Sequence, residues 1–399
     1  MCWDSLVIFL LWFCVQLFHA PWIFAPVRNV LAIWHQLTKC EIEELAKASV
    51  RMRDRGRVEE IIQNMQTAGP SELQVISDFD MTLTRFAHNG KRCPTTHNIL
   101  HSSSLISEDC KAKMSGLVAH YYPIEIDESK SVEEKVPEMV EWWTKAHDFI
   151  VQEKIRKDQL AQAVKDSGAM LREGCKSFFD MLNQTSVPLL IFSAGVGDIL
   201  EEVIRHHEVF HPNVRVFSNY MDFDENGVVH AFKGDMIHTF NKREGALLNR
   251  DQFTQLARSN ILLLGDSLGD LNMADGVQNI QNILRIGYLN DKVDERRESY
   301  VQSYDIVLEK DETLDVPNAI LNYITAGQKD LRLTSTNEEL VLRFPPTVRR
   351  RAVWLIGATS VCVCVCVCVC VCVCVCVCVC VCVCVCVCVC VCVCVCVAL

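Results

Sequence analysis

The sequence predicts an α/β protein built on a mostly parallel sheet with helices on both faces. Apolar runs of strand length alternate with helical patterns along the middle of the chain, as in parallel sheets that are covered on both sides. Three of these runs end in the acidic or hydroxyl residues that phosphate chemistry needs. Because roughly 110 residues separate the first two runs, far more than an ordinary connection requires, we also expect an inserted domain.

The expected strands can be placed in chain order. The apolar runs are 73–80, 187–195, 214–219, 261–267, 283–288 and 304–308. Helical spacing covers 41–67 before the first run, and it covers 197–208 and 270–278 between later runs. Ligands bind at the carboxyl ends of the strands in such sheets, so the ends of these runs are the candidate positions for a site.

Domain boundaries follow from the long segment between the first two runs. Residues 41–85 and 183–325 form the expected catalytic core, and residues 86–182 form the insertion. The insertion has helical character, notably at 131–152 and 155–182. We therefore expect a helical cap domain that covers the site.

Composition limits the classes of function. The 399-residue chain has a formal net charge of −11 and no basic run in its middle, so it is a poor candidate for binding nucleic acid. Of its 24 cysteines, 18 lie in 361–397, and the other six show no CxxC or CxxH spacing. We therefore expect a reducing compartment, with neither a zinc site nor a disulfide framework.

The N-terminal extension, residues 1–40, leaves two interpretations open. Residues 5–27 carry no charged side chain, as in a signal peptide or a membrane anchor. Asp4 is the only early charge, and Pro21 and Pro26 interrupt a spanning helix, which favours an alternative or mispredicted first exon. We expect a cytoplasmic protein, with membrane association through residues 5–27 as the alternative.

The C-terminal segment, residues 330–399, has low complexity. Residues 361–397 alternate Val and Cys without a break, and a strand of this sequence would be an aggregation hazard. A GT microsatellite read in frame encodes this repeat, because GTG is a Val codon and TGT is a Cys codon. We interpret the segment as a translated non-coding repeat, with a functional low-complexity tail as the alternative.

Two carboxylates follow the first apolar run. Asp78 and Asp80 lie two residues apart where the expected strand ends, and Thr82 follows them. Residues two apart in an extended chain project the same way, so both acids would face one site. One carboxylate can attack phosphorus while the other donates a proton to the leaving oxygen. A pair of exposed loop carboxylates is the alternative interpretation of this motif on its own.

Later runs end in residues that would complete such a site. Ser193 ends the second run, where a hydroxyl and free backbone N–H groups can hold phosphate oxygens. Asp266 and Asp270 follow the fourth run and can hold Mg²⁺ through oxygen ligands. Lys242 could neutralise the attacking carboxylate and the phosphate, although nothing local distinguishes it from Lys233. Each motif alone also fits an ordinary turn or a solvated side chain.

The order of these motifs resembles that of the haloacid dehalogenase superfamily of phosphatases. Asp-x-Asp-x-Thr, a serine, a lysine and Gly-Asp-Ser-x-x-Asp follow one another along the chain. Over residues 46–325 the chain resembles the cytosolic 5′-nucleotidase III family in particular, through the stretches 76–84, 90–95, 192–195 and 264–267. The resemblance implies a Rossmann-like core with a helical cap and a nucleoside monophosphate as the small-molecule substrate. We expect a monomer.

That resemblance also implies a role for each site residue. Asp78 would be the nucleophile and Asp80 the proton donor. Mg²⁺ would bind Asp78, the backbone carbonyl of Asp80 and Asp266, with Thr82 and Asp270 in support. Ser193, Ala194 and Lys242 would bind the phosphate. Glu125 and Trp143 would bind the base.

Two branches of the family differ in an aromatic residue of the cap. At position 143 this chain has Trp, which resembles the branch specific for 7-methylguanosine phosphate, whereas the pyrimidine branch has Tyr there. N7-methylation makes guanine cationic, and a cation stacks best on an indole face, while Glu125 would accept hydrogen bonds from the base. Adjacent helix residues do not share a face, so we expect Trp143 rather than Trp142 in the pocket.

Three hypotheses about function follow. The first is a 5′-nucleotidase that prefers 7-methylguanosine 5′-monophosphate, with CMP as a secondary substrate. The second is a pyrimidine-specific 5′-nucleotidase. The third is a membrane-tethered or inactive binding protein on the same fold, against which the intact Asp78, Asp80, Lys242 and Asp266 argue.

Overall fold

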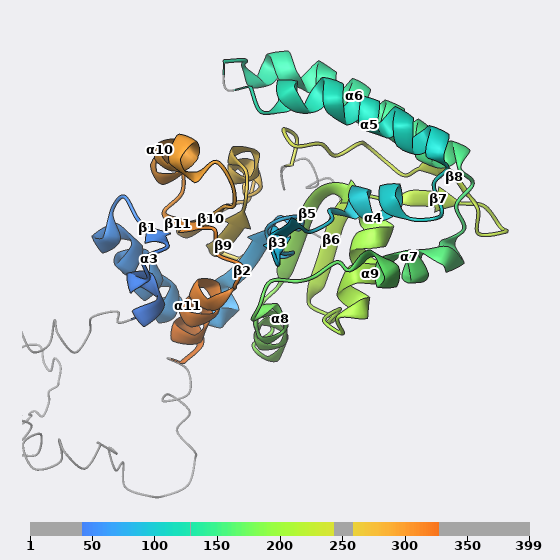
Figure 1. Cartoon of the computed structure of the whole chain (residues 1–399). Helices are drawn as coiled ribbons and strands as arrows, with labels where there is room; N and C mark the ends of the chain where they lie inside the picture. Colours follow the sequence, from blue (N-terminus) through green and yellow to red (C-terminus); the bar gives the residue numbers. More distant parts are fainter. Residues whose placement is uncertain (1–41, 128, 243–257, 327–399) are drawn as a thin grey trace, which may run out of the picture. The chain divides into compact units, whose positions relative to one another are not determined.

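The structure, a computed structural model, describes residues 42–127, 129–242 and 258–326 (Figure 1). The segments behind the membrane and low-complexity interpretations, 5–27 and 330–399, lie outside the described residues, so both interpretations stay predictions. Within the described ranges, no helix is both long enough and apolar enough to cross a membrane.

A seven-stranded sheet forms the centre of the fold. Its order is β1-β11-β10-β9-β2-β5-β6, and neighbouring strands are parallel except for β1 and β11. The bounds are β1 Val50–Arg51, β2 Leu73–Ser77, β5 Leu189–Val196, β6 Val214–Asn219, β9 Asn260–Gly265, β10 Asn282–Leu289 and β11 Ile306–Glu309. Each of the six predicted runs overlaps a strand, and the predicted α/β class is confirmed.

The sheet is buried on both faces. Every residue of β9 is buried, and its alternate residues enter two separate hydrophobic clusters, with Leu262 and Leu264 in one and Ile261 and Leu263 in the other. The first cluster includes α3 (Arg55–Ala68), α8 (Cys175–Gln184), α9 (Gly197–His206) and α11 (Asp315–Ala326). The second includes α10 (Val293–Ser303) and the segment after β9. Such double burial explains why the strands are continuous apolar runs.

The segment 86–182, which the sequence assigned to a cap, contains two groups of helices. Helices α5 and α6 pack along each other, and α6 also contacts the β7–β8 hairpin (Figure 1). Helices α4 and α7 contact α9 of the core instead, and α8 contacts α11. The bounds are α4 Thr96–Ser102, α5 Glu108–Glu125, α6 Val132–Gln152, α7 Leu160–Ser167, β7 Met221–Phe223 and β8 Val229–Phe232. The boundaries of the cap domain stay a prediction.

The expected helix at 41–67 is divided in the structure. It begins with a short 3-10 helix, η1 (Glu43–Ala46), continues as strand β1, and becomes helical again only in α3. The Asp54 side chain accepts a hydrogen bond from Arg57 N and so caps the start of α3. The predicted single helix is therefore wrong, because this cap and the pairing of β1 with β11 separate the two helical pieces.

Two other expected helices are interrupted or shortened. The stretch 155–182 breaks between α7 and α8, where Gly168 and Gly174 adopt positive φ angles of 67° and 81°. Of the stretch 270–278, only the first residues are helical, as the end of the 3-10 helix η5, which a Ser267–Asp270 capping box begins. The bounds of the short elements are η2 Pro70–Glu72, β3 Ala87–His88, β4 Lys91–Arg92, η3 Lys157–Gln159 and η5 Leu268–Asn272.

Candidate active site

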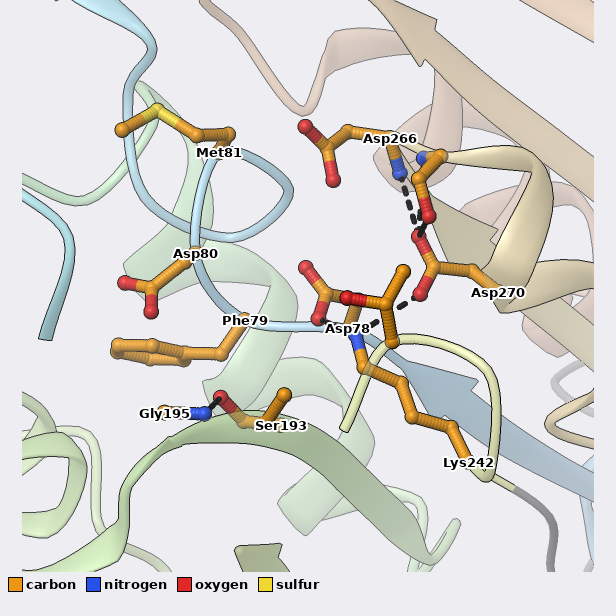
Figure 2. Close-up of polar contacts among 12 residues, drawn as sticks. Asp78, Phe79, Asp80, Met81, Ser193, Gly195, Lys242, Asp266 and Asp270 are labelled. Atoms are coloured by element: carbon orange, nitrogen blue, oxygen red, sulfur yellow. Dashed lines mark hydrogen bonds and ion pairs between the residues drawn. The ribbon is translucent and has the colours of Figure 1, made fainter. Parts of the chain in front are cut away.

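Three adjacent strands bring predicted site residues to one edge of the sheet. Strand β2 lies between β9 and β5, and the chain extends the sheet from β2 first on the β5 side and later on the β9 side. The carboxyl end of β2 is therefore a topological switch point, where ligands bind in open α/β sheets. Asp78 follows β2, Ser193 lies in β5, and Asp266 follows β9 (Figure 2).

Asp78 is a buried carboxylate with one engaged oxygen and one free oxygen. The residue is 3 % exposed, and Lys242 Nζ lies 2.5 Å from its Oδ1. Its Oδ2 is buried and has no hydrogen-bond partner among the described residues. A buried carboxylate oxygen without a partner is costly, so Oδ2 is suited to meet a cation or a phosphoryl group.

A divalent cation fits the acids around this oxygen. Carboxylate oxygens of Asp78, Asp266 and Asp270 lie within 4.8 Å of one another, and hard cations prefer such oxygen ligands. Asp270 is already engaged, because its Oδ1 accepts from Lys242 Nζ at 2.9 Å. Its Oδ2 accepts from the backbone N–H groups of Asp266 and Ser267 at 3.1 and 2.9 Å. Asp78 and Asp266 are therefore the better ligands, and Asp270 shapes the turn that presents Asp266.

Lys242 is the cation among these acids. It is 7 % exposed and pairs with both Asp78 and Asp270 (Figure 2). Burial alone lowers the pKa of the lysine, but the Asp270 and Asp78 charges outweigh burial and raise the pKa of Lys242. Lys233, which the sequence could not distinguish from it, has a side chain that is 57 % exposed. The structure therefore separates the two lysines by burial.

Burial raises the pKa of the acids at this edge. It raises the pKa of Asp78 to about 7, even with Lys242 beside it. It also raises the pKa of Asp80 to about 6, against hydrogen bonds from Thr96 that lower it. The pKa of Asp266 is raised well above its usual range by burial and by the charges of Asp78 and Asp270. A carboxyl group with a pKa near 6 can donate a proton close to neutral pH.

Thr96, the first residue of α4, holds the Asp80 side chain. Its backbone N–H donates to Asp80 Oδ1 at 2.9 Å, and its hydroxyl donates to Oδ2 at 2.8 Å. No motif in the sequence indicates Thr96, and the only signal for it is its position directly after the matching stretch 90–95. Thr82 is buried, and its hydroxyl has no hydrogen-bond partner among the described residues, so its supporting role stays a prediction.

Ser193 and Ala194 lie at the end of β5, where the chain passes close to Asp80. The next residue must be Gly195, because a Cβ there would collide with Thr96 Oγ1 and would lie 3.0 Å from Asp80 Oδ2. Ser193 is 1 % exposed, and its Oγ accepts a hydrogen bond from Gly195 N at 3.0 Å (Figure 2). The close approach leaves the Ser193 hydroxyl and the backbone at this end of β5 beside the acids.

Trp143 is a cap side chain that reaches the core. It is 9 % exposed, and its indole Nε1 donates to the carbonyl oxygen of Ala194 at 2.9 Å. Asn219 Nδ2, which was not among the predicted site residues, donates to the same oxygen at 2.9 Å from the end of β6. Trp142 instead stacks on Tyr121, with ring centroids 5.8 Å apart. Of the two tryptophans, Trp143 is the one that bonds to the end of β5, where the phosphate site is predicted.

Glu125 connects the end of α5 to a core loop. Its Oε1 accepts a hydrogen bond from Thr239 Oγ1 at 2.5 Å, and Lys135 Nζ donates to its backbone carbonyl at 3.0 Å. Burial raises the pKa of the Glu125 carboxyl group. Glu125 is therefore not a solvated loop acid, and Thr239, three residues before Lys242, is a contact that the sequence did not indicate.

Comparison with known proteins identifies relatives along most of the chain. A family model described as pyrimidine 5′-nucleotidase (UMPH-1) matches residues 81–325. The 7-methylguanosine phosphate-specific 5′-nucleotidase of Homo sapiens is 60 % identical over 285 residues, which cover 71 % of this chain and 95 % of that protein. The protein of the same name from Drosophila melanogaster is 37 % identical over 292 residues, which cover 72 % of this chain and 91 % of that protein.

A solved structure agrees with these relatives. The crystal structure of cytosolic 5′-nucleotidase IIIB bound to cytidine matches with a TM-score of 0.68 and 36 % sequence identity, covering 72 % of this chain and 97 % of that chain. The family expected from the motifs is confirmed by these matches. The chain belongs to the pyrimidine 5′-nucleotidase (UMPH-1) family of phosphoric monoester hydrolases.

Proposed function

We propose that this protein hydrolyses 7-methylguanosine 5′-monophosphate to the nucleoside and phosphate through an aspartyl-phosphate on Asp78. The observation that carries the proposal is the buried Asp78 carboxylate, with Lys242 at one oxygen and no hydrogen-bond partner at the other among the described residues. Relatives named 7-methylguanosine phosphate-specific 5′-nucleotidase support the choice of substrate. The proposed enzyme is a cytoplasmic monomer.

In the first step, an Asp78 carboxylate oxygen attacks phosphorus, and the bond between phosphorus and the 5′ oxygen breaks. Asp80 gives its proton to that oxygen, so the nucleoside leaves as a neutral alcohol. The two hydrogen bonds from Thr96 hold the Asp80 carboxyl group in one orientation. Positioning of this kind is part of the catalytic effect, because the proton donor need not search for its target.

In the second step, water attacks phosphorus and the bond between phosphorus and the Asp78 oxygen breaks. Asp80, now ionised, takes a proton from the water. Inorganic phosphate is released, Asp78 returns to a carboxylate, and Asp80 is protonated again, so the enzyme ends as it began. One residue thus serves as acid in the first step and as base in the second.

A metal ion held by the acids and the ammonium group of Lys242 would together offset the negative charge of the phosphate. Asp78, the backbone carbonyl of Asp80, and Asp266 would hold Mg²⁺, which when bound supplies charge neutralisation at the phosphoryl oxygens. Lys242 Nζ adds a second positive charge at Asp78. The Ser193 hydroxyl and the Ala194 N–H group would bind the remaining phosphate oxygens.

The cap residues support recognition of a methylated purine. The hydrogen bond from Trp143 Nε1 to the carbonyl of Ala194 places the indole next to the end of β5 that would bind phosphate. A cationic base stacked on Trp143 would gain the cation–π attraction of an indole face. The Glu125 carboxyl group, which contacts Thr239 without ligand, would accept hydrogen bonds from the base.

A pyrimidine-specific 5′-nucleotidase is the second candidate. The matching family model is described as pyrimidine 5′-nucleotidase, and the related cytosolic 5′-nucleotidase IIIB has been crystallised with cytidine. We propose CMP as a secondary and not the preferred substrate, because the indole of Trp143 favours a cationic base. An inactive binding protein is disfavoured, because Asp78, Asp80 and Lys242 are all present and grouped at one sheet edge.

A three-substrate assay tests the proposed function. Turnover of 7-methylguanosine 5′-monophosphate, GMP and CMP is compared on one preparation, with Mg²⁺ and then with EDTA. We expect the highest kcat/KM for the methylated nucleotide, a lower value for CMP, the lowest for GMP, and loss of all three activities in EDTA that is reversed by added Mg²⁺. Preference for CMP would favour the pyrimidine-specific candidate. Undiminished activity in EDTA would contradict the metal-dependent mechanism.

The proposed cytoplasmic location is tested by fractionation of the native protein. We expect the full chain in the supernatant after high-speed centrifugation without detergent. Recovery only from the membrane pellet, and only with detergent, would instead favour an anchor in residues 5–27.

A further inference from the structure

Asn290 lies at the same sheet edge as the acids but has no part in the reaction proposed above. It directly follows β10, the strand next to β9. Its Nδ2 donates to the carbonyl oxygen of Met81 at 3.0 Å and to Asp266 Oδ2 at 3.4 Å. Its Oδ1 accepts from Arg172 Nη2 at 2.8 Å. One side-chain amide therefore joins the turn after β2 to the turn after β9.

Arg172 determines which way this amide points. Its guanidinium is fully buried, and its carbon Cζ lies 4.0 Å from the centroid of the Tyr288 ring. Because a guanidinium has only donors, the amide must turn its oxygen toward Arg172. Its NH₂ group must then face Met81 and Asp266. The chemistry of the neighbours thus fixes the orientation of the Asn290 amide.

The turn that these two residues hold has an unfavourable backbone conformation. Met81 has a φ angle of 64°, which is uncommon for a residue other than glycine. Arg172 donates to the carbonyl oxygens of Met81 at 2.5 Å and Thr82 at 2.7 Å, and Thr84 Oγ1 accepts from Met81 N at 2.8 Å. These bonds hold the backbone directly after Asp80, whose carbonyl is one of the groups proposed to bind Mg²⁺.

We propose that Asn290, oriented by Arg172, is a positioning residue that holds the turn after β2 and the Asp266 carboxylate at the spacing a magnesium ion requires. The inference rests on the metal-dependent function proposed above. Hydrogen bonds that orient metal-binding carboxylates contribute strongly to metal affinity, and their loss typically weakens affinity or activity by 10- to 100-fold. Asn290 is such a partner for Asp266.

Magnesium binding to an Asn290→Ala variant tests the inference without any substrate. The metal-free full chain is titrated with MgCl₂ in a calorimeter, and we expect a Kd roughly 10- to 100-fold higher than that of the wild type. Asn282→Ala is the matched control, because Asn282 lies at the opposite end of β10 and donates to Asn260 Oδ1 at 2.7 Å. The control should keep the wild-type Kd. Equal Mg²⁺ affinity in Asn290→Ala and the wild type would overturn the inference.

Rescue by metal separates a positioning role from general damage to the fold. At saturating MgCl₂ we expect Asn290→Ala to regain most of the wild-type kcat, and in EDTA we expect its unfolding temperature to stay close to that of the wild type. A kcat that remains low at saturating Mg²⁺ would contradict positioning of the metal site. Asn290→Ser is measured in the same way if the alanine variant does not fold. A wild-type protein that binds no Mg²⁺ would overturn the proposed function as well, so the two failures are distinguishable.

Discussion

The sheet edge and the cap of this enzyme contribute different kinds of side chain and are held in different ways. At the sheet edge, Asp78, Lys242 and Asp270 are each at most 7 % exposed and are paired with one another. From the cap, Trp143 and Glu125 reach the core through hydrogen bonds to the Ala194 carbonyl and the Thr239 hydroxyl. The proposed bond-breaking groups thus lie in a buried charge network, whereas the proposed base-recognition groups lie on helices α5 and α6.

This difference teaches which part of the site can change during evolution without loss of the reaction. Removing one member of a buried charge network leaves its partners uncompensated, which is severely unfavourable. One aromatic face can replace another at a cost of about 1 kcal/mol. We therefore expect substitutions at the sheet edge to abolish turnover and substitutions in the cap to change the choice of substrate.

The largest effect is expected at the nucleophile. Asp78→Asn keeps the shape of the side chain but removes its nucleophilic oxygen, and it should lower kcat for 7-methylguanosine 5′-monophosphate by roughly four orders of magnitude. Asp294→Asn changes a carboxylate that is 95 % exposed on α10 and is the matched control. Steady-state phosphate release measures both variants. Turnover near the wild-type rate in Asp78→Asn would break the assignment of the covalent step to the sheet edge.

A smaller but still large effect is expected at Lys242. Lys242→Met leaves the Asp78 and Asp270 carboxylates without their shared cation, and kcat should fall by roughly 10²- to 10³-fold. Lys233→Met is the control, because Lys233 is exposed beside Asp222 and should be silent. Equal kinetic parameters for the two variants would show that burial does not distinguish the two lysines.

A moderate effect on selectivity is expected in the cap. Trp143→Tyr removes the indole face and the N–H donor to Ala194, and the kcat/KM ratio of 7-methylguanosine 5′-monophosphate to CMP should fall by roughly fivefold to tenfold. Trp142→Tyr should lower this ratio less, because Trp142 stacks on Tyr121 and only supports Trp143 edge-on, with ring centroids 4.7 Å apart. Competition between the two nucleotides in one reaction measures the ratio directly. An unchanged ratio in Trp143→Tyr would contradict stacking of the methylated base on Trp143.

The smallest effect is a displacement of the pH profile. Burial raises the pKa of Asp80 to about 6, and the Thr96 hydroxyl opposes that rise. Thr96→Val removes the hydroxyl, so the pKa of Asp80 should rise further. A proton donor works below its pKa, and the alkaline limb of nucleoside release should therefore move to higher pH. Single-turnover rates between about pH 5 and pH 9 test this, and a limb that moves to lower pH would contradict the role of Asp80.

The sheet edge was largely predictable because its signals are local in the sequence. An apolar run that ends in Asp78 and Asp80 already indicates a buried strand and the residues at its carboxyl end. Likewise, the apolar run before Asp266 indicates the strand that becomes β9. Parallel strands connected by helices place their carboxyl ends at the same edge of a sheet. The residues that follow these two strands are therefore expected to lie close together.

The residues that hold the acids were not predictable, because each comes from a distant part of the chain. Thr96 is 16 positions from Asp80, and Asn290 is 24 positions from Asp266. Arg172 reaches Met81 across 91 positions. No local pattern distinguishes a buried threonine, arginine or asparagine of this kind from the same residue on the surface. The prediction of one helix over 41–67 was wrong for a similar reason, because β1 forms through its pairing with the distant strand β11.

Chemical trapping of the phosphorylated enzyme tests the central claim most directly. The wild-type protein is mixed with 7-methylguanosine 5′-monophosphate and Mg²⁺, quenched in acid during turnover, and treated with sodium borohydride, which reduces an acyl phosphate to the alcohol. Peptide mass spectrometry should then find homoserine in place of aspartate at position 78. Homoserine at position 80 or 266 instead, or an unmodified Asp78 in enzyme that turns over its substrate, would contradict covalent catalysis by Asp78.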